Sequence, residues 1–233
     1  MKPHRSPPVR SRRQATRREV ARVYEILLRR QGHAGWWPGS SSFEIALGAI
    51  LVQNTAWTNA AKALAVLRGR RLLSFRALDR LSAEDIAPLV RSSGTYRVKA
   101  RRVRAFLDFL ASSFGGRIAA MGRSTPSALR EALLGVPGIG PETADSIALY
   151  AAGQPLFVID AYTRRVFSRL GFIRGDESYD ALQRFFTDRL RAEAPLFNDY
   201  HAQIVRLAKD HCRTRPLCHN CPLEAGCAKR GVG

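Results

Sequence analysis

The stretch GVPGIGPETADSIALYA, Gly135 to Ala151, decides the fold of this 233-residue chain. Its first seven residues hold three glycines and two prolines, which is typical of a tight turn between helices. Gly138 and Gly140 can adopt positive φ and leave backbone N–H groups uncovered. The next helix, about residues 142–151, points its N-terminus at the same place. The turn therefore predicts an anion site that fits a DNA phosphate, or else a turn that binds nothing.

Helical spacing of apolar residues extends outward from this turn in both directions. Thr125 and Pro126 predict the N-cap and first residue of the helix before the turn, and Ser82 with Asp85 forms a capping-box signature. No strand alternation is found, so an all-α fold of roughly ten helices is expected. The other helical segments cover residues 19–31, 42–55, 57–69, 82–94, 98–116, 161–172, 178–190 and 198–212.

The charge balance points to a polyanionic partner. The formal net charge is +19, with 38 Lys and Arg against 19 Asp and Glu, and most of the cations are Arg. The arginine guanidinium binds phosphate through two N–H groups at once, so nucleic acid is the simplest partner. A solvated basic surface is the alternative. Residues 1–18 are basic and rich in Pro and Ser, which predicts a disordered tail and no secretory signal. No apolar run reaches the length of a membrane span of about 18 residues.

All four cysteines lie close together in the sequence, at Cys212, Cys218, Cys221 and Cys227. Four thiolates in so short a stretch favour a metal centre in a reducing compartment. A cytoplasmic, nucleoid-associated protein is therefore expected. An iron–sulfur cluster, zinc or no metal remain open from the spacing alone.

The turn and a later aspartate together carry a family resemblance. VIDAYTRRV follows the hairpin by about twenty residues and places Asp160 before a helix. Together with the cysteines, this pattern resembles the endonuclease III superfamily of DNA glycosylases over about residues 19–227. The resemblance implies two helical lobes with a DNA-binding cleft between them. A helix-hairpin-helix lobe at residues 40–151 and a second lobe at residues 19–39 and 152–233 are expected.

Asp160 is the first candidate catalytic residue. A carboxylate at a helix N-terminus is held ionised, and the bland alternative is an ordinary N-cap. The resemblance implies that this aspartate stabilises the cationic sugar as the base leaves and helps to activate water. The damaged base must first be flipped out of double-stranded DNA.

Glu142 stands where bifunctional members of this superfamily carry a lysine. That lysine forms a Schiff base with the sugar, which a glutamate cannot do. The chain has five lysines, none of them in the hairpin: Lys2, Lys62, Lys99, Lys209 and Lys229. A monofunctional glycosylase is therefore expected, with Glu142 positioning water or substrate, or serving only as a first-turn acid.

Three tryptophans lie between residues 36 and 57 and suggest a pocket for the base. The segment resembles the 3-methyladenine-excising branch of the superfamily, which implies that Trp36 and Trp57 form the lesion pocket, with Trp37 and Pro38 beside it. Aromatic faces suit a cationic alkylated purine, although any single Trp could be core packing. Gln53 matches the residue that enters the duplex where the base has left, or is a polar helix-end residue.

Basic residues in two segments are candidate DNA contacts. The segment SSGTYRVKARRVRAF resembles a family segment near DNA, and a solvated basic face is its alternative. The candidate phosphate contacts are Arg97, Lys99, Arg101, Arg102, Arg213 and Arg215. The cysteine spacing C-x5-C-x2-C-x5-C is similar to the 4Fe–4S loop of endonuclease III, with one residue fewer in the first gap.

The sequence as a whole predicts a monomeric base excision repair glycosylase that carries a 4Fe–4S cluster. It is expected to be monofunctional and to act on a damaged, alkylated base. A bifunctional enzyme that also cleaves abasic sites and a non-enzymatic helix-hairpin-helix DNA-binding protein are the alternatives.

Overall fold

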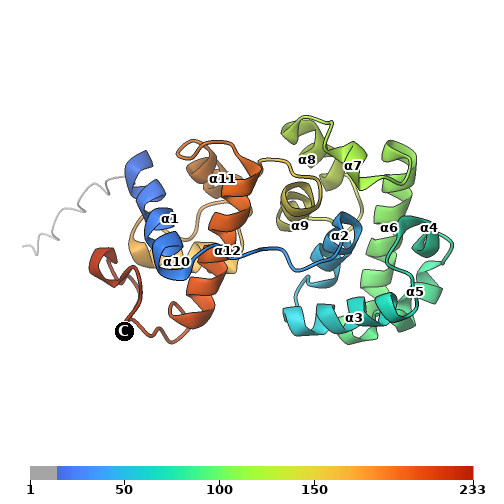
Figure 1. Cartoon of the computed structure of the whole chain (residues 1–233), viewed down its shortest axis with the longest axis horizontal. Coiled ribbons are helices and arrows are strands. Elements are labelled where there is room, and N and C mark those ends of the chain that lie inside the picture. The colour runs from blue at the N-terminus through green and yellow to red at the C-terminus, as the bar shows by residue number, and fades with distance from the viewer. Residues whose placement is uncertain (1–14, 233) are drawn as a thin grey trace, which may run out of the picture.

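A computed structural model describes residues 15–232 and shows that they form helices and loops, with no strand in this range. The all-α prediction is therefore confirmed. Figure 1 shows the helices gathered in two halves, with α2 to α9 in one and α1, α10, α11 and α12 in the other. The helices are α1 (Arg17–Gln31), α2 (Ser42–Leu51), α3 (Trp57–Gly69), α4 (Phe75–Leu78), α5 (Ala83–Leu89), α6 (Tyr96–Phe114), α7 (Ile118–Met121), α8 (Pro126–Leu134), α9 (Pro141–Ser146), α10 (Ala161–Leu170), α11 (Tyr179–Thr187) and α12 (Ala194–Asp210).

Three short helical turns complete the described elements: η1 (Arg91–Ser93), η2 (Ile147–Ala151) and η3 (Glu224–Gly226). The turn η2 is π-helical and continues directly from α9, where the sequence predicted one α-helix. A π-turn adds a residue per turn, so it rotates the side chains that follow it.

Two hydrophobic clusters underlie the two halves. One contains buried residues between 43 and 156, and the other contains residues of α1 together with residues between 149 and 223. The turn η2 contributes Ile147 and Ala148 to the first cluster, and Leu149 and Tyr150 to the second. The turn η2 therefore packs into both hydrophobic clusters. The lobe limits expected from the sequence, at residues 40–151 and at residues 19–39 with 152–233, stay a prediction.

A buried polar bridge also joins the two halves. Asp145 on α9 is fully buried and accepts hydrogen bonds from Arg130 on α8, at 3.0 Å, and from Gln183 on α11, at 2.6 Å. Arg130 also bonds to Asp180 on α11, at 2.7 Å. A buried carboxylate is stable only when it is paired in this way.

The capping predictions are confirmed. Thr125 caps α8 with Pro126 at its first position, and Ser82 and Asp85 form a reciprocal capping box at α5. The helix α1 begins at Arg17, earlier than expected, because Thr16 accepts a hydrogen bond from the amide of Glu19. The predicted tail at residues 1–18 thus overlaps α1, and its residues 1–14 lie outside the described residues.

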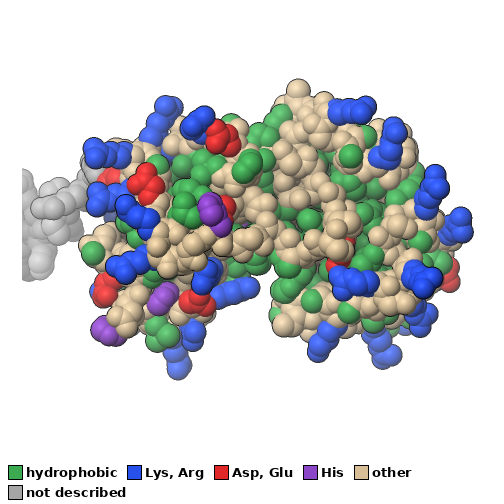
Figure 2. All heavy atoms as spheres, viewed as in Figure 1, with side chains coloured by type: hydrophobic (Ala, Val, Ile, Leu, Met, Phe, Trp, Pro, Cys, Tyr) green, Lys and Arg blue, Asp and Glu red, His purple; other side chains and the backbone are tan. Residues whose placement is uncertain are grey.

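Basic side chains are spread over the molecule. Figure 2 shows Lys and Arg around the periphery of both halves and not gathered in a single patch on this face. Within residues 15–232, no helix combines the length and apolar character needed to cross a membrane.

Candidate active site

Asp160 lies at the N-terminus of α10. Its side chain accepts a 2.7 Å hydrogen bond from the amide of Thr163, so Asp160 is the N-cap of α10, which was the structural alternative to a catalytic role. The extended chain before it, Phe157 to Ile159, is buried in the second hydrophobic cluster. Buried backbone on one side and a helix on the other therefore fix the position of this carboxylate, and only 13 % of its side chain is exposed.

His201 on α12 faces Asp160, and the sequence analysis missed it. Its Nε2 atom lies 3.4 Å from an Asp160 oxygen, close enough for an ion pair but without hydrogen-bond alignment. Its Nδ1 atom is 2.7 Å from the buried hydroxyl of Tyr150, in the π-turn. A tyrosine hydroxyl that donates to Nδ1 leaves the proton on Nε2, toward Asp160. The only sequence signal for this pair is a His and a Tyr at buried helix positions.

The environment keeps Asp160 ionised. Burial alone raises the pKa of this carboxyl, but the neighbouring His201 ring and the hydrogen bond from the Thr163 amide outweigh it. The pKa of Asp160 therefore lies below its usual value. The same surroundings raise the pKa of the Tyr150 hydroxyl far above its usual value, through burial first and the charge of Asp160 second. The Tyr150 hydroxyl therefore keeps its proton at neutral pH.

Glu142 shares this site. It lies in the first turn of α9, and more than a third of the residue is accessible to solvent. The pKa of Glu142 is nevertheless raised to about 7, because the surrounding protein removes solvation and Asp160 adds a second negative charge; His201 offsets part of this. Two neighbouring carboxyls whose pKa values are shifted in opposite directions can take different roles in catalysis.

The tryptophans form one aromatic series. Trp37 contacts Trp36 at a ring-centroid distance of 5.6 Å, Trp57 at 5.3 Å and Tyr150 at 5.0 Å. Trp37 thus lies between the two rings expected to hold a base, so a base must displace it or stack on an outer face. The buried indole N–H of Trp37 has no acceptor among the described residues, whereas that of Trp36 lies near the Tyr150 hydroxyl. Buried donors without an acceptor are rare in native proteins, so a ligand or a water molecule can serve as the acceptor here.

The hairpin presents free amides. Gly138 has a positive φ of 84°, whereas Gly140 has an ordinary φ of −91°, because it serves as the N-cap of α9. Val136 and Ile139 are buried and anchor the turn, while both glycines are exposed. Neither glycine N–H donates to an acceptor within the described part of the chain.

Gln53 and Arg102 brace this hairpin. The Gln53 amide donates to the Gly138 carbonyl, at 3.1 Å, and to the Thr143 hydroxyl, at 2.8 Å. Arg102 donates to the Gln53 carbonyl oxygen, at 2.6 Å. Gln53 can therefore enter a duplex only after these bonds break. A Cβ on Gly138 would lie 2.5 Å from Arg102 Cγ, so glycine is required for this contact.

Lys99 does not contact phosphate, and that prediction is wrong. The side chain is 1 % exposed, and its ammonium donates to the carbonyls of Leu51, at 2.8 Å, and Ser93. The sequence could not show that this face of α6 packs inward. Arg97, Arg101, Arg213 and Arg215 are exposed, as phosphate contacts must be, and their role stays a prediction.

The four cysteines line one small cavity, together with the apolar side chains of Pro216, Leu217 and Val232. Within residues 15–232, no group of three or more Cys, His, Asp or Glu side chains is arranged to hold a single metal ion. Arg169 donates toward the sulfur of Cys212, at 3.5 Å, and the Lys229 amide toward that of Cys227, at 3.4 Å. The sulfurs thus surround a shared space and do not meet at one point.

Comparison with known proteins agrees with this geometry. The model of the HhH-GPD superfamily of base excision DNA repair proteins matches residues 47–192. A Methanocaldococcus jannaschii protein, provisionally named a DNA repair glycosylase, is 38 % identical over 91 % of this chain and 96 % of its own.

Two solved structures share the fold. The H. pylori 3-methyladenine DNA glycosylase bound to 1,N6-ethenoadenine has a TM-score of 0.72 and 28 % identity, covering 84 % of this chain and 98 % of its own. A trapped covalent complex of endonuclease III with DNA has a TM-score of 0.78 and 22 % identity, covering 93 % and 97 % of the two chains. This second likeness shows the fold alone.

The chain therefore belongs to the HhH-GPD superfamily of base excision DNA repair proteins. Its activity is that of a base excision repair DNA glycosylase.

Proposed function

We propose that this chain is a monofunctional glycosylase that hydrolyses the N-glycosidic bond of an alkylated purine flipped out of double-stranded DNA. The observation that carries the proposal is the pair Asp160 and Glu142, two carboxyls with divided pKa values beside an aromatic series. No lysine lies in the hairpin, where a Schiff base would have to form.

Asp160 carries the chemical step in this proposal. As the base leaves, the sugar acquires positive charge, and an ionised carboxylate stabilises that charge. His201 and Tyr150 hold the carboxylate in place and ionised. Glu142, with a pKa of about 7, accepts the proton of the attacking water.

An alkylated purine suits the aromatic series. A cationic ring gains energy from aromatic faces, and its glycosidic bond is already weak, so strong acid catalysis is not required. The unpaired indole N–H group of Trp37 can donate to a ring nitrogen. The H. pylori relative bound to 1,N6-ethenoadenine also holds a modified purine, which supports this substrate class.

The hairpin holds the DNA strand. The free N–H groups of Gly138 and Gly140, at the N-terminus of α9, bind one backbone phosphate of the duplex. Arg213 and Arg215 lie in the cysteine loop and add phosphate contacts there. The protein acts as a monomer.

Borohydride trapping separates this proposal from a bifunctional enzyme. The wild type is expected to release a methylated purine without forming a covalent adduct, whereas Glu142→Lys is expected to form one, because it places an amine in the hairpin. The positive result with the variant makes the negative result with the wild type meaningful. Lys209 Nζ lies 5.8 Å from the Trp36 ring and is the control. A wild-type adduct that disappears in Lys209→Gln would overturn the monofunctional assignment.

The four thiols fit a 4Fe–4S cluster better than a single ion. Tetrahedral zinc draws four sulfurs to within about 3.8 Å of one another, given Zn–S bonds of about 2.3 Å, whereas a cluster spreads them around a larger body. Burial raises the pKa of the Cys221 and Cys227 thiols, and the neighbouring cysteines raise it further. Their deprotonation therefore requires a cationic metal centre beside them. We infer that Cys212, Cys218, Cys221 and Cys227 hold the cluster, which orders the loop bearing Arg213 and Arg215.

Metal analysis tests this inference. Anaerobically purified protein is expected to contain about four iron atoms and acid-labile sulfide per chain, and Cys218→Ala is expected to lose both. His219→Ala, an exposed neighbour, is the matched control and is expected to keep them. One zinc per chain, or no metal, would contradict the cluster.

A further inference from the structure

The segment that leads into Asp160 is buried without a β partner. Phe157, Val158 and Ile159 are each at most 2 % exposed. Within the described part of the chain, no backbone–backbone hydrogen bond reaches these three residues. Buried backbone groups need partners, so side chains must supply them here. The position of Asp160, which follows directly, depends on those side chains.

Two side chains of α11 hold this segment. The Gln183 amide donates to the carbonyl of Phe157, at 3.0 Å, and the backbone amide of Ile159 donates to the hydroxyl of Tyr179, at 3.3 Å. Tyr179 and Gln183 are four residues apart on α11, so they lie on the same face of that helix. Apolar packing is not directional, whereas hydrogen bonds are. These two bonds therefore fix where the segment lies along its own length, and not only its depth in the core.

Both of these side chains also bond to Asp145 on α9. Gln183 donates to one Asp145 oxygen, at 2.6 Å, and Arg130 donates to the other, at 3.0 Å. The Tyr179 hydroxyl donates to the same carboxyl. Burial first, and the charge of Asp145 second, raise the pKa of this hydroxyl well above its usual value, so it keeps its proton for the bond. The carboxyl of Asp145 is thus the common acceptor for the two side chains that hold the segment.

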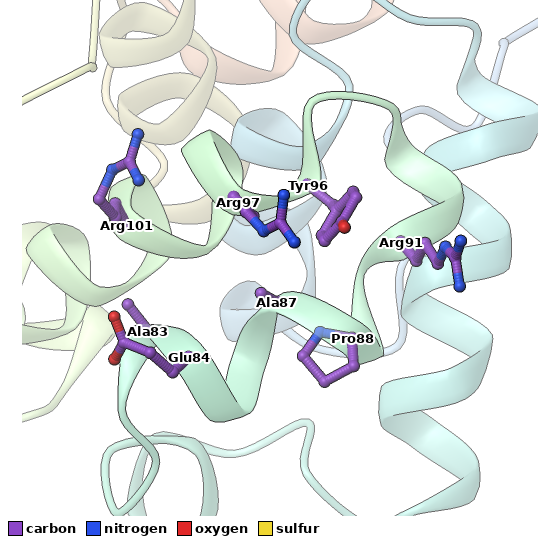
Figure 3. Close-up of a pocket in the computed structure, with 8 residues that line it drawn as sticks. All are labelled: Ala83, Glu84, Ala87, Pro88, Arg91, Tyr96, Arg97 and Arg101. Atoms are coloured by element: carbon purple, nitrogen blue, oxygen red, sulfur yellow. The ribbon is translucent and has the colours of Figure 1, made fainter.

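The hydroxyl of Tyr179, and not its ring, makes this arrangement distinct. The Arg130 guanidinium lies 5.8 Å from the centroid of the Tyr179 ring, and Arg97 has a comparable contact with Tyr96 on α6, at 5.3 Å. Figure 3 shows Tyr96 and Arg97 side by side in a groove between α5 and α6. Within residues 15–232 the Tyr96 hydroxyl makes no hydrogen bond. A tyrosine–arginine contact therefore does not itself require the two bonds that the Tyr179 hydroxyl makes.

The same network reaches the helix that carries Glu142. Asp145 lies three residues after Glu142 on α9, so a shift of that helix moves both side chains. Through Asp145, α9 is tied to the segment before Asp160. Loss of one link would let Asp160 move relative to Glu142. A displacement of about 1 Å in a reacting geometry can cost about a hundredfold in rate.

We propose that Asp145, Tyr179 and Gln183 are positioning residues for base excision, which set the place of Asp160 relative to Glu142. The proposal rests on the proposed function in that Asp160 must be the catalytic carboxylate. The three side chains act through Asp160, so they govern the rate of bond cleavage and not the affinity for DNA.

Tyr179→Phe tests the proposal with little disturbance of the core, because it removes one oxygen and keeps the ring. Single-turnover excision is measured on a duplex that carries one methylated purine, at saturating enzyme and after subtraction of uncatalysed release. The rate is expected to fall about tenfold or more, while affinity for the undamaged duplex matches that of the wild type. Gln183→Met, which removes both bonds of that amide, is expected to slow excision likewise. A wild-type rate in either variant overturns the proposal.

A double-mutant cycle separates positioning from general damage to the fold. In the Asp160→Asn background, Tyr179→Phe is expected to change the residual rate by less than about twofold, because a residue that acts through the carboxylate has no effect once it is gone. An equal loss in both backgrounds assigns the effect to the fold and overturns the proposal.

Asp180→Asn is the matched control on α11. Asp180 is the exposed partner of Arg130, at 2.7 Å, next to Tyr179 in the sequence, and it makes no bond to residues 157–159 in the described structure. The control is expected to keep the wild-type rate, and a loss equal to that of Tyr179→Phe would count against positioning.

The outcomes distinguish this inference from the proposed function. A wild-type rate for Asp160→Asn would overturn the proposed function and this inference with it. An inactive Asp160→Asn beside a fully active Tyr179→Phe would overturn this inference alone.

Discussion

Asp160→Asn is expected to lower the single-turnover rate of base excision by about a thousandfold or more. The carboxylate lies at the base of the site with His201 beside it, and its lowered pKa keeps it negative throughout the neutral range. Asparagine occupies the same volume without the charge. The variant therefore removes the group that stabilises the cationic sugar and little else.

The second role of Asp160 makes this variant informative. Asp160 caps α10, and asparagine caps helices about as well as aspartate does. The melting temperature of Asp160→Asn is therefore expected to stay close to that of the wild type, and DNA affinity to hold or rise as a negative charge is lost. Asp160→Ala is the contrast, because it loses about 1 kcal/mol of capping as well. A rate for Asp160→Asn within threefold of the wild type would leave a non-enzymatic DNA-binding protein as the better account.

Glu142→Gln is expected to lower the excision rate about a hundredfold at pH 8 and to flatten its pH dependence. The pKa of Glu142 is about 7. Below that pH the carboxyl is protonated and cannot accept a proton from water; above it the carboxylate can. The wild-type rate is therefore expected to rise with pH and to level off above about pH 7, and glutamine has no such transition.

Single-turnover rates from about pH 5.5 to pH 8.5 provide the measurement. Glu131→Gln is the matched control, because it removes an exposed carboxyl from α8 and is expected to leave the profile unchanged. An inflection near pH 7 that persists in Glu142→Gln assigns it to another group, with His201 next to be tested. A wild-type rate that falls as pH rises through 7 makes Glu142 an acid and contradicts its role as a base.

Features encoded in a few neighbouring residues could be predicted from the sequence. The caps at Thr125 and Ser82 and the turn at Gly138 depend on local hydrogen bonds and backbone geometry, so short sequence patterns are enough to indicate them. The placement of Asp160 before a helix follows from the same local rules.

Features set by packing between distant segments could not be predicted. His201 meets Asp160 because α12 folds against α10, and Tyr150, which contacts His201, lies in the π-helical turn after α9. Lys99 carries the positive charge expected of a phosphate contact, yet its ammonium group donates to buried backbone carbonyl groups. Trp37 contacts both Trp36 and Trp57, whereas the sequence placed it beside a pocket formed by those two rings.

The buried bridge from Arg130 through Asp145 to Gln183 has a mechanical consequence. Opening the two halves would strip partners from a carboxylate that is fully buried, at a cost of several kcal/mol. The bridge thus opposes separation of the two halves. Smoothly bending a short duplex costs on the order of 1–6 kcal/mol, and less where stacking is already weakened. Under the proposed function, a duplex softened at a lesion would therefore bend against this protein at a lower cost than an intact one.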